Sequence, residues 1–545
     1  MTMKKYITIL MTAVAAFAAT SCKDFLEPTQ IDLIYNEAFW ETQADAEVGV
    51  TGIYSLYRGL MSSSANWYQR ADVTCGFVKN GWSGGSNRNY YTVGNYSDVS
   101  SVERMWGSID SACDWGPFYK VIAQANLVIS KILLMDVSSF KSQDAYNQLL
   151  GEAYFLRALT YFNILRAWGD APLITEAIES SSQVIDKDHS PLLIPRSTDF
   201  EIASQVLDDV DQAVLLLDYG TYGTANWGIR ANKGSALALQ AHANMWANFL
   251  AKRDRLPNPL SYVQAAITAL EDLKEHGGYA YVDYSNVDAV KAMFNGQSQE
   301  AVFELYVGTE NNESYRADRS GVQAFTCKMT PLDNDPTHDR SAGIDWIPYS
   351  QKSKLYPEYD FALGGPDIRP HLFFGAWDST YNEPFNETQG SSTNDRTKVT
   401  WLTKWSQLAE DTEREQESYI AYFGECNIPV FRYTDSMLLL AEAYYKNGDE
   451  DKALSIVNDI RHRAGLGDYA GADLLSEIMQ QRVSELFGEG YLYYDFVRNN
   501  YWPNAHLMGA VKYRQKGYYW PVSSNVLSTN TLIDQTPYWN GKCNW

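Results

Sequence analysis

Small and apolar residues recur through the middle of the chain in a pattern that is typical of paired helices. The pattern is clearest in three segments, residues 152–165, 235–250 and 262–273. Apolar residues three and four positions apart share one face of a helix, and alanines on that face let a second helix approach closely. The pattern therefore predicts a mainly helical scaffold in which neighbouring helices stack on one another.

One stretch near the C-terminus matches a tetratricopeptide unit. Residues 435–465 read DSMLLLAEAYYKNGDEDKALSIVNDIRHRAG. Ala441 and Ala443 permit close contact between two helices. Gly448 supplies the turn, and Ala453 opens the packing face of the second helix. An ordinary helical hairpin is the alternative, but several helix pairs share the pattern, which favours tetratricopeptide-like packing.

Further helices are expected on both sides of these segments. A first helix is predicted over residues 36–60, where apolar side chains recur near helical spacing at Phe39, Ala46, Val50, Ile53 and Leu56. Asp199 and Ser261 stand where N-caps are expected. The remaining predicted helices cover residues 117–135, 144–168, 199–217, 231–252, 261–276, 433–447, 450–464 and about 474–490.

Two long segments lack a sustained helical period. Residues 61–104 are rich in Gly, Ser, Asn and aromatic residues, and residues 277–432 suggest short strands and long loops, with a strand at 301–307. Long irregular segments inside a domain are usually functional. The expected fold is therefore mainly α. A tetratricopeptide-like helical-repeat scaffold over about 36–60, 117–276 and 433–498 carries these loop-rich segments and a few short strands, within one domain that spans 36–545.

The N-terminal residues have the features of a bacterial export signal. Two lysines precede an apolar stretch over residues 6–19, and small residues then lead to Cys22. This arrangement resembles the lipobox of bacterial lipoproteins, in which the cysteine thiol is acylated. We therefore expect residues 1–21 to be a signal peptide, Cys22 to be lipidated and residues 22–35 to be a tether. A plain signal peptide and an uncleaved anchor are the alternatives.

The composition restricts the class of ligand. A net charge of −23 argues against nucleic acid and against an anionic ligand. The six cysteines are widely scattered without a CxxC motif, which excludes a disulfide scaffold and gives no zinc spacing. Aromatic residues make up 14% of the chain, and many of them stand among Gly, Ser and Asn. Exposed rings flanked by amides and hydroxyls suit carbohydrate, which offers both a C–H face and hydroxyl groups.

Several motifs, taken in order, carry a resemblance to one family. They are NEAFWETQADAEVGVTGIYSLY (36–57), EAYFLRALTYFNILRAWGDAPLI (152–174), RYTDSMLLLAEAYYKNG (432–448), RVSELFGEGYLYYDFVR (482–498) and YYWPVSSNVLSTNTLIDQTPYW (518–539). In this order the chain resembles the SusD/RagB family, the surface glycan-binding lipoproteins of Bacteroidetes. The resemblance implies an outer-membrane lipoprotein that faces the cell exterior. It also implies that the protein captures oligosaccharide or polysaccharide and delivers it to a SusC-like TonB-dependent transporter, without catalysis.

The resemblance also implies that glycan binds to aromatic residues on loops outside the helical scaffold. In the first such segment, Trp82 lies in NGWSGGSN, where three glycines favour an exposed indole. Arg70 and Asp72 fit a local ion pair equally well, and Tyr90 and Tyr91 fit partial burial. The expected glycan-binding residues are Arg70, Asp72, Asn80, Trp82, Asn87, Tyr90 and Tyr91, followed by Tyr315, Trp346 and Tyr349 in the second segment. Trp227, Trp377, Trp401 and Trp405 are alternatives.

Two other functional classes stay open at this point. A secreted glycoside hydrolase needs a pair of carboxylates, and the 67 acidic residues supply such pairs by chance, so no pair stands out. No nucleophile, zinc-protease or phosphate-binding motif is present in the sequence. His242 is expected in the core and His462 on the surface. No cofactor is expected, and a structural Ca²⁺ site has no sequence signature. The third class is a tetratricopeptide-type scaffold that binds only proteins.

Overall fold

The structure is a computed structural model, and most of the elements that it defines are helices. It describes residues 39–61, 75, 78–80, 110, 113–180, 183, 192–306, 346–348, 366–375, 401–402, 404, 408–416, 419–424, 426–502 and 508–543. The longer helices are α2 (Gln43–Met61), α6 (Gly116–Leu134), α7 (Gln143–Trp168), α8 (Asp199–Leu216), α9 (Lys233–Arg253), α10 (Leu260–His276), α14 (Tyr433–Asn447), α15 (Glu450–Arg463) and α16 (Leu474–Leu486).

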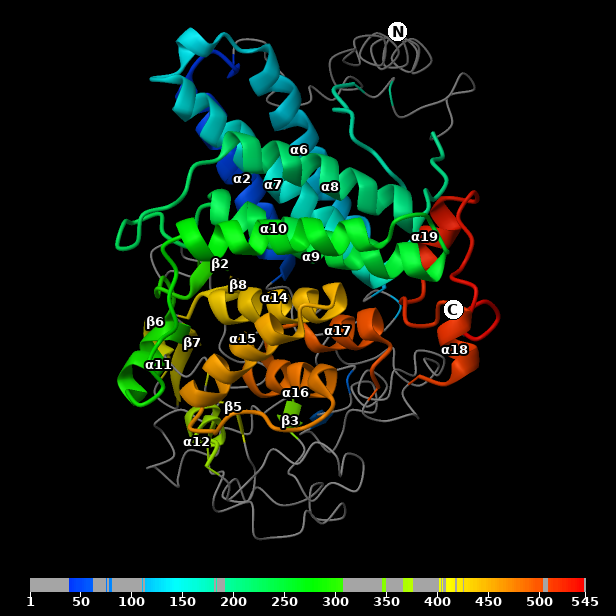
Figure 1. The fold of residues 1–545 in the computed structure, drawn as a ribbon. Coiled ribbons are helices and arrows are strands. Elements are labelled where there is room, and N and C mark those ends of the chain that lie inside the picture. The colour runs from blue at the N-terminus through cyan, green and yellow to red at the C-terminus, as the bar shows by residue number, and fades with distance from the viewer. Residues whose placement is uncertain are drawn as a thin grey trace, which may run out of the picture.

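These helices stack as a continuous array (Figure 1). Each one packs on the next along the chain from α2 through α6, α7, α8 and α9 to α10. Helix α10 then packs on α14, and α14 packs on both α15 and α16. The predicted tetratricopeptide-like stacking of helices is therefore confirmed, although a long stretch of chain separates α10 from α14.

Helices α7 and α9 form the centre of this array. In α9 every residue from Gly234 to Ala251 is buried except Gln240. A helix that is buried on all sides needs small residues for close contact and apolar residues for burial, and the alternating alanines and large side chains supply both. Helix α8 instead buries one stripe, with Ile202, Val206 and Val210 facing the core.

The tetratricopeptide-like unit has the expected local structure. Gly448 follows α14 in the left-handed region at φ +90°, a conformation that glycine adopts without a steric penalty. Ala441, Ala443 and Ala453 are fully buried, and α14 packs on α15. Each of these alanines removes the side-chain bulk that would hold the two helix axes apart.

Both predicted N-caps are wrong. Thr198 caps α8 in a reciprocal capping box: its hydroxyl accepts from the Glu201 N–H, while the Glu201 carboxylate accepts from the Thr198 N–H. The Asp199 carboxylate is buried and paired with Arg253 at 2.6 Å, so it is not available as a cap. Helix α10 starts one residue before Ser261, whose hydroxyl donates to the Asn258 carbonyl instead.

Two helix boundaries also differ from the prediction. Helix α2 begins at Gln43, later than the predicted start, and Leu56 is 40% exposed on its outer side. Helix α16 ends at Leu486, before the predicted end at about residue 490, because Gly488 and Gly490 both take positive φ and break the helix. A short helix that the sequence did not predict, α17 (Leu492–Asn499), follows.

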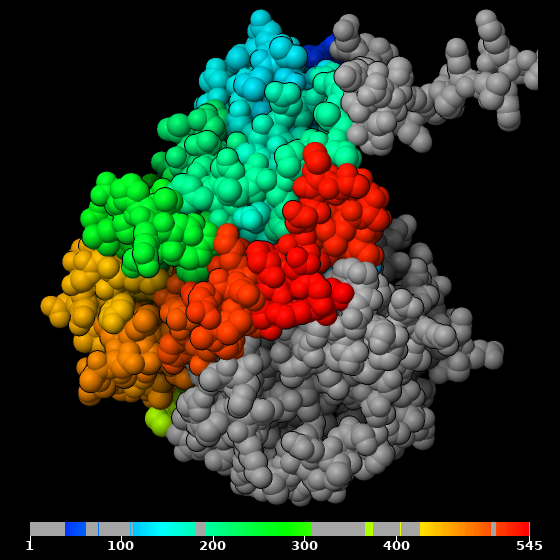
Figure 2. Space-filling view, turned by 90° about the vertical axis from the view of Figure 1, so that its right-hand side faces the viewer, coloured from blue at the N-terminus to red at the C-terminus, as the bar shows by residue number. Residues whose placement is uncertain are grey.

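The C-terminal residues close over the helical array. They include the short helices α18 (Ala510–Arg514) and α19 (Ser524–Thr529), and they lie against the earlier helices in the red region of Figure 2. The Trp520 N–H donates to the Ala167 carbonyl at 2.7 Å, and the Trp168 indole donates to the Pro521 carbonyl at 3.1 Å. Trp520 is buried and packs edge-on against Trp168, so the C-terminal segment is part of the core.

The strands of the described residues form four antiparallel pairs. β2 (Ala301–Leu305) lies within the predicted strand at 301–307 and pairs with β8 (Ile428–Arg432) inside the core. The other pairs are β1 (Val78–Asn80) with β3 (Trp346–Pro348), β4 (Phe374–Gly375) with β5 (Trp401–Leu402), and β6 (Leu408–Gln416) with β7 (Tyr419–Gly424). None of the helices described here is long and apolar enough to cross a membrane.

Candidate functional site

Two of the predicted glycan-binding residues come together in one strand pair. β1 and β3 run antiparallel, and their register places Asn80 opposite Trp346. The two residues belong to the two separate segments that the sequence marks as glycan-binding. The other predicted residues lie outside the described residues: Cys22, Arg70, Asp72, Trp82, Asn87, Tyr90, Tyr91, Tyr315 and Tyr349.

A second strand pair adjoins the first. β3 contacts β5, and β5 pairs with β4 so that Gly375 lies opposite Trp401. These strands lie at one end of the helical array, beyond α16 (Figure 1). We call β1, β3, β4 and β5 the strand layer. Trp401, one of the alternative tryptophans, belongs to this layer.

Trp227 does not belong to the strand layer. Its side chain is 1% exposed, and its indole N–H donates to the Ser298 carbonyl at 2.7 Å. It also packs against Tyr222 and Tyr279 in the core. The turn that contains it (residues 221–230) is polar in sequence, but it folds inward because the large ring fills a core position. Trp227 is therefore excluded as a sugar-stacking residue, while Trp377 and Trp405 lie outside the described residues.

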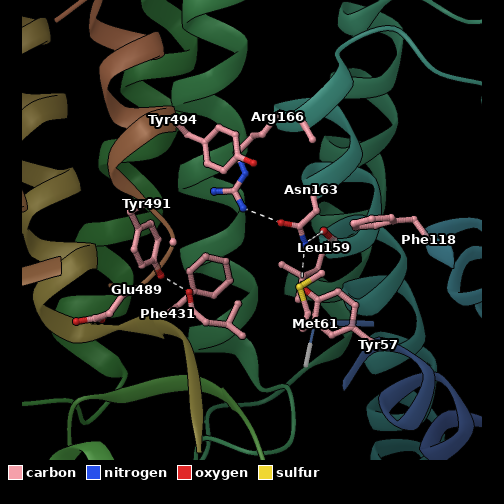
Figure 3. Close-up of a pocket in the computed structure, with 13 residues that line it drawn as sticks. Tyr57, Met61, Phe118, Leu159, Asn163, Arg166, Phe431, Glu489, Tyr491 and Tyr494 are labelled. Atoms are coloured by element: carbon pink, nitrogen blue, oxygen red, sulfur yellow. Dashed lines mark hydrogen bonds between the residues drawn. The ribbon is translucent and has the colours of Figure 1, made fainter. Parts of the chain in front are cut away.

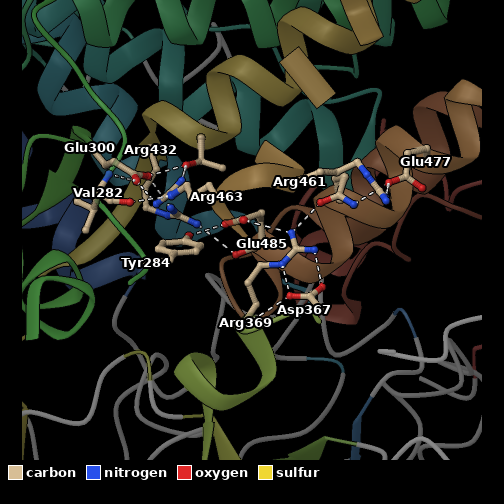
Figure 4. Close-up of polar contacts among 12 residues, drawn as sticks. Val282, Tyr284, Glu300, Asp367, Arg369, Arg432, Arg461, Arg463, Glu477 and Glu485 are labelled. Carbon is tan, nitrogen blue, oxygen red and sulfur yellow. Dashed lines mark hydrogen bonds and ion pairs between the residues drawn. The ribbon is translucent and has the colours of Figure 1, made fainter. Parts of the chain in front are cut away.

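An arginine that precedes β4 in the sequence reaches into the helical array. Arg369 opens the short helix α12 (Arg369–Phe373), which runs directly into β4. Its guanidinium is buried and pairs with the Asp367 carboxylate at 2.7 Å. It also donates to Gln481 Oε1 at 2.8 Å and to Glu485 Oε1 at 3.2 Å, both on α16 (Figure 4). This arginine joins one end of the strand layer to the scaffold.

A lysine makes the equivalent connection on the other side. Lys404 follows β5 by two residues and is buried. Its Nζ donates to the carbonyls of Glu485 and Phe487 at 2.6 and 3.1 Å and pairs with Glu489 Oε1 at 2.7 Å. Burial lowers the pKa of Lys404, and the Glu489 carboxylate opposes that shift. The lysine therefore fixes the end of β5 to the backbone that follows α16.

Arg369 and Lys404 belong to a larger buried cluster. Arg432 on β8 pairs with Glu489 at 2.7 Å and with Glu300 at 2.8 Å. Arg463 also pairs with Glu300, and the Tyr284 hydroxyl donates to Glu485 at 2.6 Å. We call this set the boundary cluster, and its charged members balance: four cations, Arg369, Lys404, Arg432 and Arg463, face four carboxylates, Glu300, Asp367, Glu485 and Glu489.

The arginines of the boundary cluster favour the ionised form of Glu485 despite its burial. Burial alone raises the pKa of Glu485, but Arg369, Arg463 and Arg432 together hold it below its ordinary value. A buried ion pair is tolerated only when further hydrogen bonds satisfy both partners, which the carbonyls and hydroxyl of this cluster supply. The cluster is thus able to hold the strand layer in one position relative to the helices.

Sequence reasoning missed the boundary cluster. Glu489 stands between Gly488 and Gly490 and is not among the predicted site residues, yet it is buried with both oxygens in ion pairs. A carboxylate between two glycines directly after a buried helix was the available indication. The two histidine predictions are confirmed: His242 is 2% exposed and His462 is exposed. No group of three or more metal-ligating side chains gathers among the described residues.

Comparison with known proteins places the chain in a family. Residues 329–539 match the SusD family, and residues 59–243 match a family described as starch-binding and associating with the outer membrane. A SusD-like protein of Formosa agariphila is 25% identical over 574 residues, which cover 98% of this chain and all of that protein.

Solved structures agree with this assignment. A SusD homologue from Bacteroides thetaiotaomicron superimposes with a TM-score of 0.68 at 24% identity, covering 92% of this chain and 99% of the homologue. A laminarin-binding SusD-like protein gives a TM-score of 0.64 at 19% identity, covering 91% and 99% of the two chains. The helical array has the fold of these proteins, and the two sequence matches cover most of its length. The chain belongs to the SusD/RagB family.

Proposed function

We propose that this protein binds an oligosaccharide or polysaccharide at the cell surface and delivers it to a SusC-like TonB-dependent transporter in the outer membrane. The observation that carries the proposal is the β1–β3 pair, because it joins two aromatic- and amide-rich segments at Asn80 and Trp346. Membership of the SusD/RagB family supports glycan as the ligand, as does the fold shared with a laminarin-binding protein.

The proposed binding residues supply aromatic rings and polar side chains, and two of them, Asn80 and Trp346, belong to the strand layer. Trp82, Trp346, Tyr349 and Tyr315 offer flat faces for sugar rings, and Tyr90 and Tyr91 extend that surface. Asn80, Asn87, Arg70 and Asp72 bond the hydroxyl groups around each ring. The chain carries a net charge of −23, so a neutral glycan is the favoured class.

The protein reaches its place of action as a lipoprotein. Residues 1–21 direct export and are removed, and Cys22 is acylated, so that residues 22–35 tether the domain at 36–545 to the outer face of the membrane. A tether of this length keeps the protein near its transporter. The glycan is passed on unchanged, because the protein acts by binding and not by hydrolysis.

Binding of a glycan panel tests the proposal. The mature protein is run in affinity electrophoresis with neutral polysaccharides, including laminarin and starch, and a retarding glycan is then titrated by calorimetry. Trp346→Ala removes one stacking ring and is expected to weaken affinity about tenfold, equivalent to ~1.4 kcal/mol. Tyr222→Ala is the matched control, because Tyr222 is an exposed aromatic of the scaffold, 53% accessible and outside the strand layer.

Three outcomes contradict the proposal. A protein that no polysaccharide retards favours a scaffold that binds only proteins. Equal losses of glycan affinity in Trp346→Ala and Tyr222→Ala indicate that the glycan binds away from the strand layer. Release of reducing ends from a bound glycan, abolished by one Asp or Glu substitution, favours a hydrolase instead.

A further inference from the structure

A small cavity lies inside the scaffold, and no residue of the strand layer lines it. Its volume is about 40 Å³, and it lies between α7 on one side and β8, α17 and the residues just before α17 on the other (Figure 3). Arg166 and Asn163 line it from α7, Tyr57 from α2, and Phe431 and Tyr494 from the C-terminal side. One water molecule needs roughly 10–15 Å³ of such space, so the cavity holds a few waters or one small ion but no sugar ring.

The side chain that distinguishes this cavity is Arg166. Its guanidinium lies between two aromatic rings, 4.3 Å from the Phe162 centroid and 4.5 Å from the Tyr494 centroid. Nη2 donates to Asn163 Oδ1 at 2.7 Å, but the buried Nε–H has no acceptor. None of the described carboxylates forms an ion pair with Arg166, whereas Arg157 and Arg432, which are similarly enclosed, each pair with one or more.

The one carboxylate that lines the cavity is already occupied. Glu489 uses Oε1 for Lys404 and Arg432 and Oε2 for Arg432 again. It therefore belongs to the boundary cluster and forms no ion pair with Arg166, on which Asp495 acts only at longer range. Taking a cation out of water without a counter-ion costs several kcal/mol, so such a site favours an anion.

A second hydrogen-bond donor lines the same cavity. The Tyr57 hydroxyl accepts from Asn163 Nδ2 at 2.8 Å, which leaves its own proton available for a further acceptor. Tyr57 is 1% exposed, and burial keeps its pKa above the ordinary value, so the hydroxyl stays protonated. The cavity thus combines a guanidinium N–H and a phenol O–H, with no free acceptor among the groups just described.

We propose that this cavity binds one small monovalent anion such as chloride, held by the Arg166 Nε–H and the Tyr57 hydroxyl. The anion neutralises Arg166 where α7 faces β8 and α17, and so it stabilises the contact between α7 and these two elements. This site is separate from the strand layer and does not depend on the proposed glycan function.

Thermal unfolding of the mature protein tests the site. The midpoint is measured in sodium chloride and in sodium gluconate at equal ionic strength, because gluconate is too large to enter a cavity of about 40 Å³. Chloride is expected to raise the midpoint with a saturable dependence on concentration, as binding to the folded state alone requires. Tyr57→Phe keeps the ring and removes the hydroxyl, and is expected to weaken the binding of chloride about tenfold.

Arg166→Met and a matched arginine variant complete the test. Arg166→Met is expected to abolish the difference between chloride and gluconate. Arg196→Met is the control, because Arg196 donates only to the carbonyls of Asp170, Asp534 and Trp168 and lies outside the cavity. Arg196→Met is expected to lower the midpoint of unfolding and to keep the dependence of that midpoint on chloride.

A crystal grown in sodium bromide gives an independent readout. An anomalous peak beside Arg166 Nε supports the proposal. Density for water alone at that position overturns it, and so does a chloride effect that is absent or equally large in Arg166→Met. If Arg166→Met does not fold, Tyr57→Phe and the bromide crystal still decide between an anion and water.

Discussion

The protein contains two buried charge clusters that differ in what they join. The scaffold cluster consists of residues on helices alone: His242 on α9, Asp435 and Glu442 on α14, Arg482 on α16, and Asp495 and Arg498 on α17. The boundary cluster instead includes Arg369 and Lys404, which come from the chain around the strand layer. One cluster holds helix to helix, and the other holds strands to helices.

The two clusters differ because their surroundings differ. The helices around the scaffold cluster already have long buried faces, so its ion pairs add to packing that fixes their positions. Strands of two or three residues have little pairing of their own, and an isolated two-stranded pair is marginally stable. From this difference we expect the scaffold cluster to govern the free energy of unfolding of the whole protein. We expect the boundary cluster to govern the positions of Asn80 and Trp346.

The largest effect is expected at the centre of the scaffold cluster. Arg482 pairs with Asp495 at 2.6 Å and with Asp435 at 2.8 Å, and all three side chains are buried. Arg482→Met leaves two buried carboxylates short of a partner and is expected to destabilise the protein by about 5 kcal/mol, the upper end for a broken buried pair. Urea unfolding measures the loss.

Lys452→Met is the control for that variant. Lys452 is 59% exposed and faces Glu271 at 3.7 Å, so its replacement is expected to change the free energy of unfolding by less than about 1 kcal/mol. A loss in Arg482→Met no larger than in Lys452→Met shows that the scaffold cluster does not govern stability.

A smaller loss of stability and a specific loss of binding are expected at Lys404. Glu489 keeps Arg432 when Lys404 is removed, so Lys404→Met is expected to destabilise the protein by about 3 kcal/mol, the lower end of the same range. Because β5 loses its attachment to the end of α16, glycan affinity is expected to fall about tenfold, equivalent to ~1.4 kcal/mol. Calorimetry below the unfolding transition measures it.

Lys446→Met is the matched variant, because Lys446 pairs with Glu442 of the scaffold cluster. Lys446 is largely buried and pairs with Glu442 at 3.0 Å, so its loss is expected to reduce stability and leave glycan affinity unchanged. If both lysine variants bind glycan as the wild type does while Trp346→Ala does not, the boundary cluster is structural only. If Trp346→Ala also binds normally, the proposed glycan site itself is wrong.

Much of the scaffold could be predicted from the sequence. Helices α7 and α9 were found because their alanine-rich apolar pattern depends only on residues three and four apart. The cap of α8 was missed by one position, since Asp199 is a suitable capping residue and only the fold shows that Arg253 occupies it. Local spacing cannot reveal a competing partner that lies elsewhere in the chain.

The candidate site was predicted in parts. Composition identified the segments around Asn80 and Trp346 separately, but their pairing depends on tertiary structure that no periodicity records. The boundary cluster was missed for the same reason, because Arg369 and Glu485 lie 116 positions apart. Trp227 shows the opposite error: its neighbours are polar, yet one hydrogen bond to Ser298 completes a buried position for the indole.

The smallest expected effect is a pH dependence that only the scaffold cluster has. His242 is buried against Asp435 at 2.8 Å, with Arg482 and Arg498 nearby, and it stacks on Phe431 and Tyr491. Burial lowers the pKa of His242 below its ordinary value of about 6.5, although Asp435 opposes that shift. The titratable members of the boundary cluster include no histidine.

The sign of this dependence follows from proton binding. Below about pH 6.5 the unfolded chain takes up a proton at residue 242 more readily than the folded protein, so stability falls as the pH drops, by at most about 1.4 kcal/mol per pH unit. Urea unfolding at pH 7.5 and 5.5 is expected to show this fall in the wild type and a smaller one in His242→Gln. Glycan affinity is expected to stay constant over the same range, because the boundary cluster contains no histidine. Equal pH dependence in the two proteins removes His242 as the cause, and a parallel fall in affinity shows that the two clusters act as one.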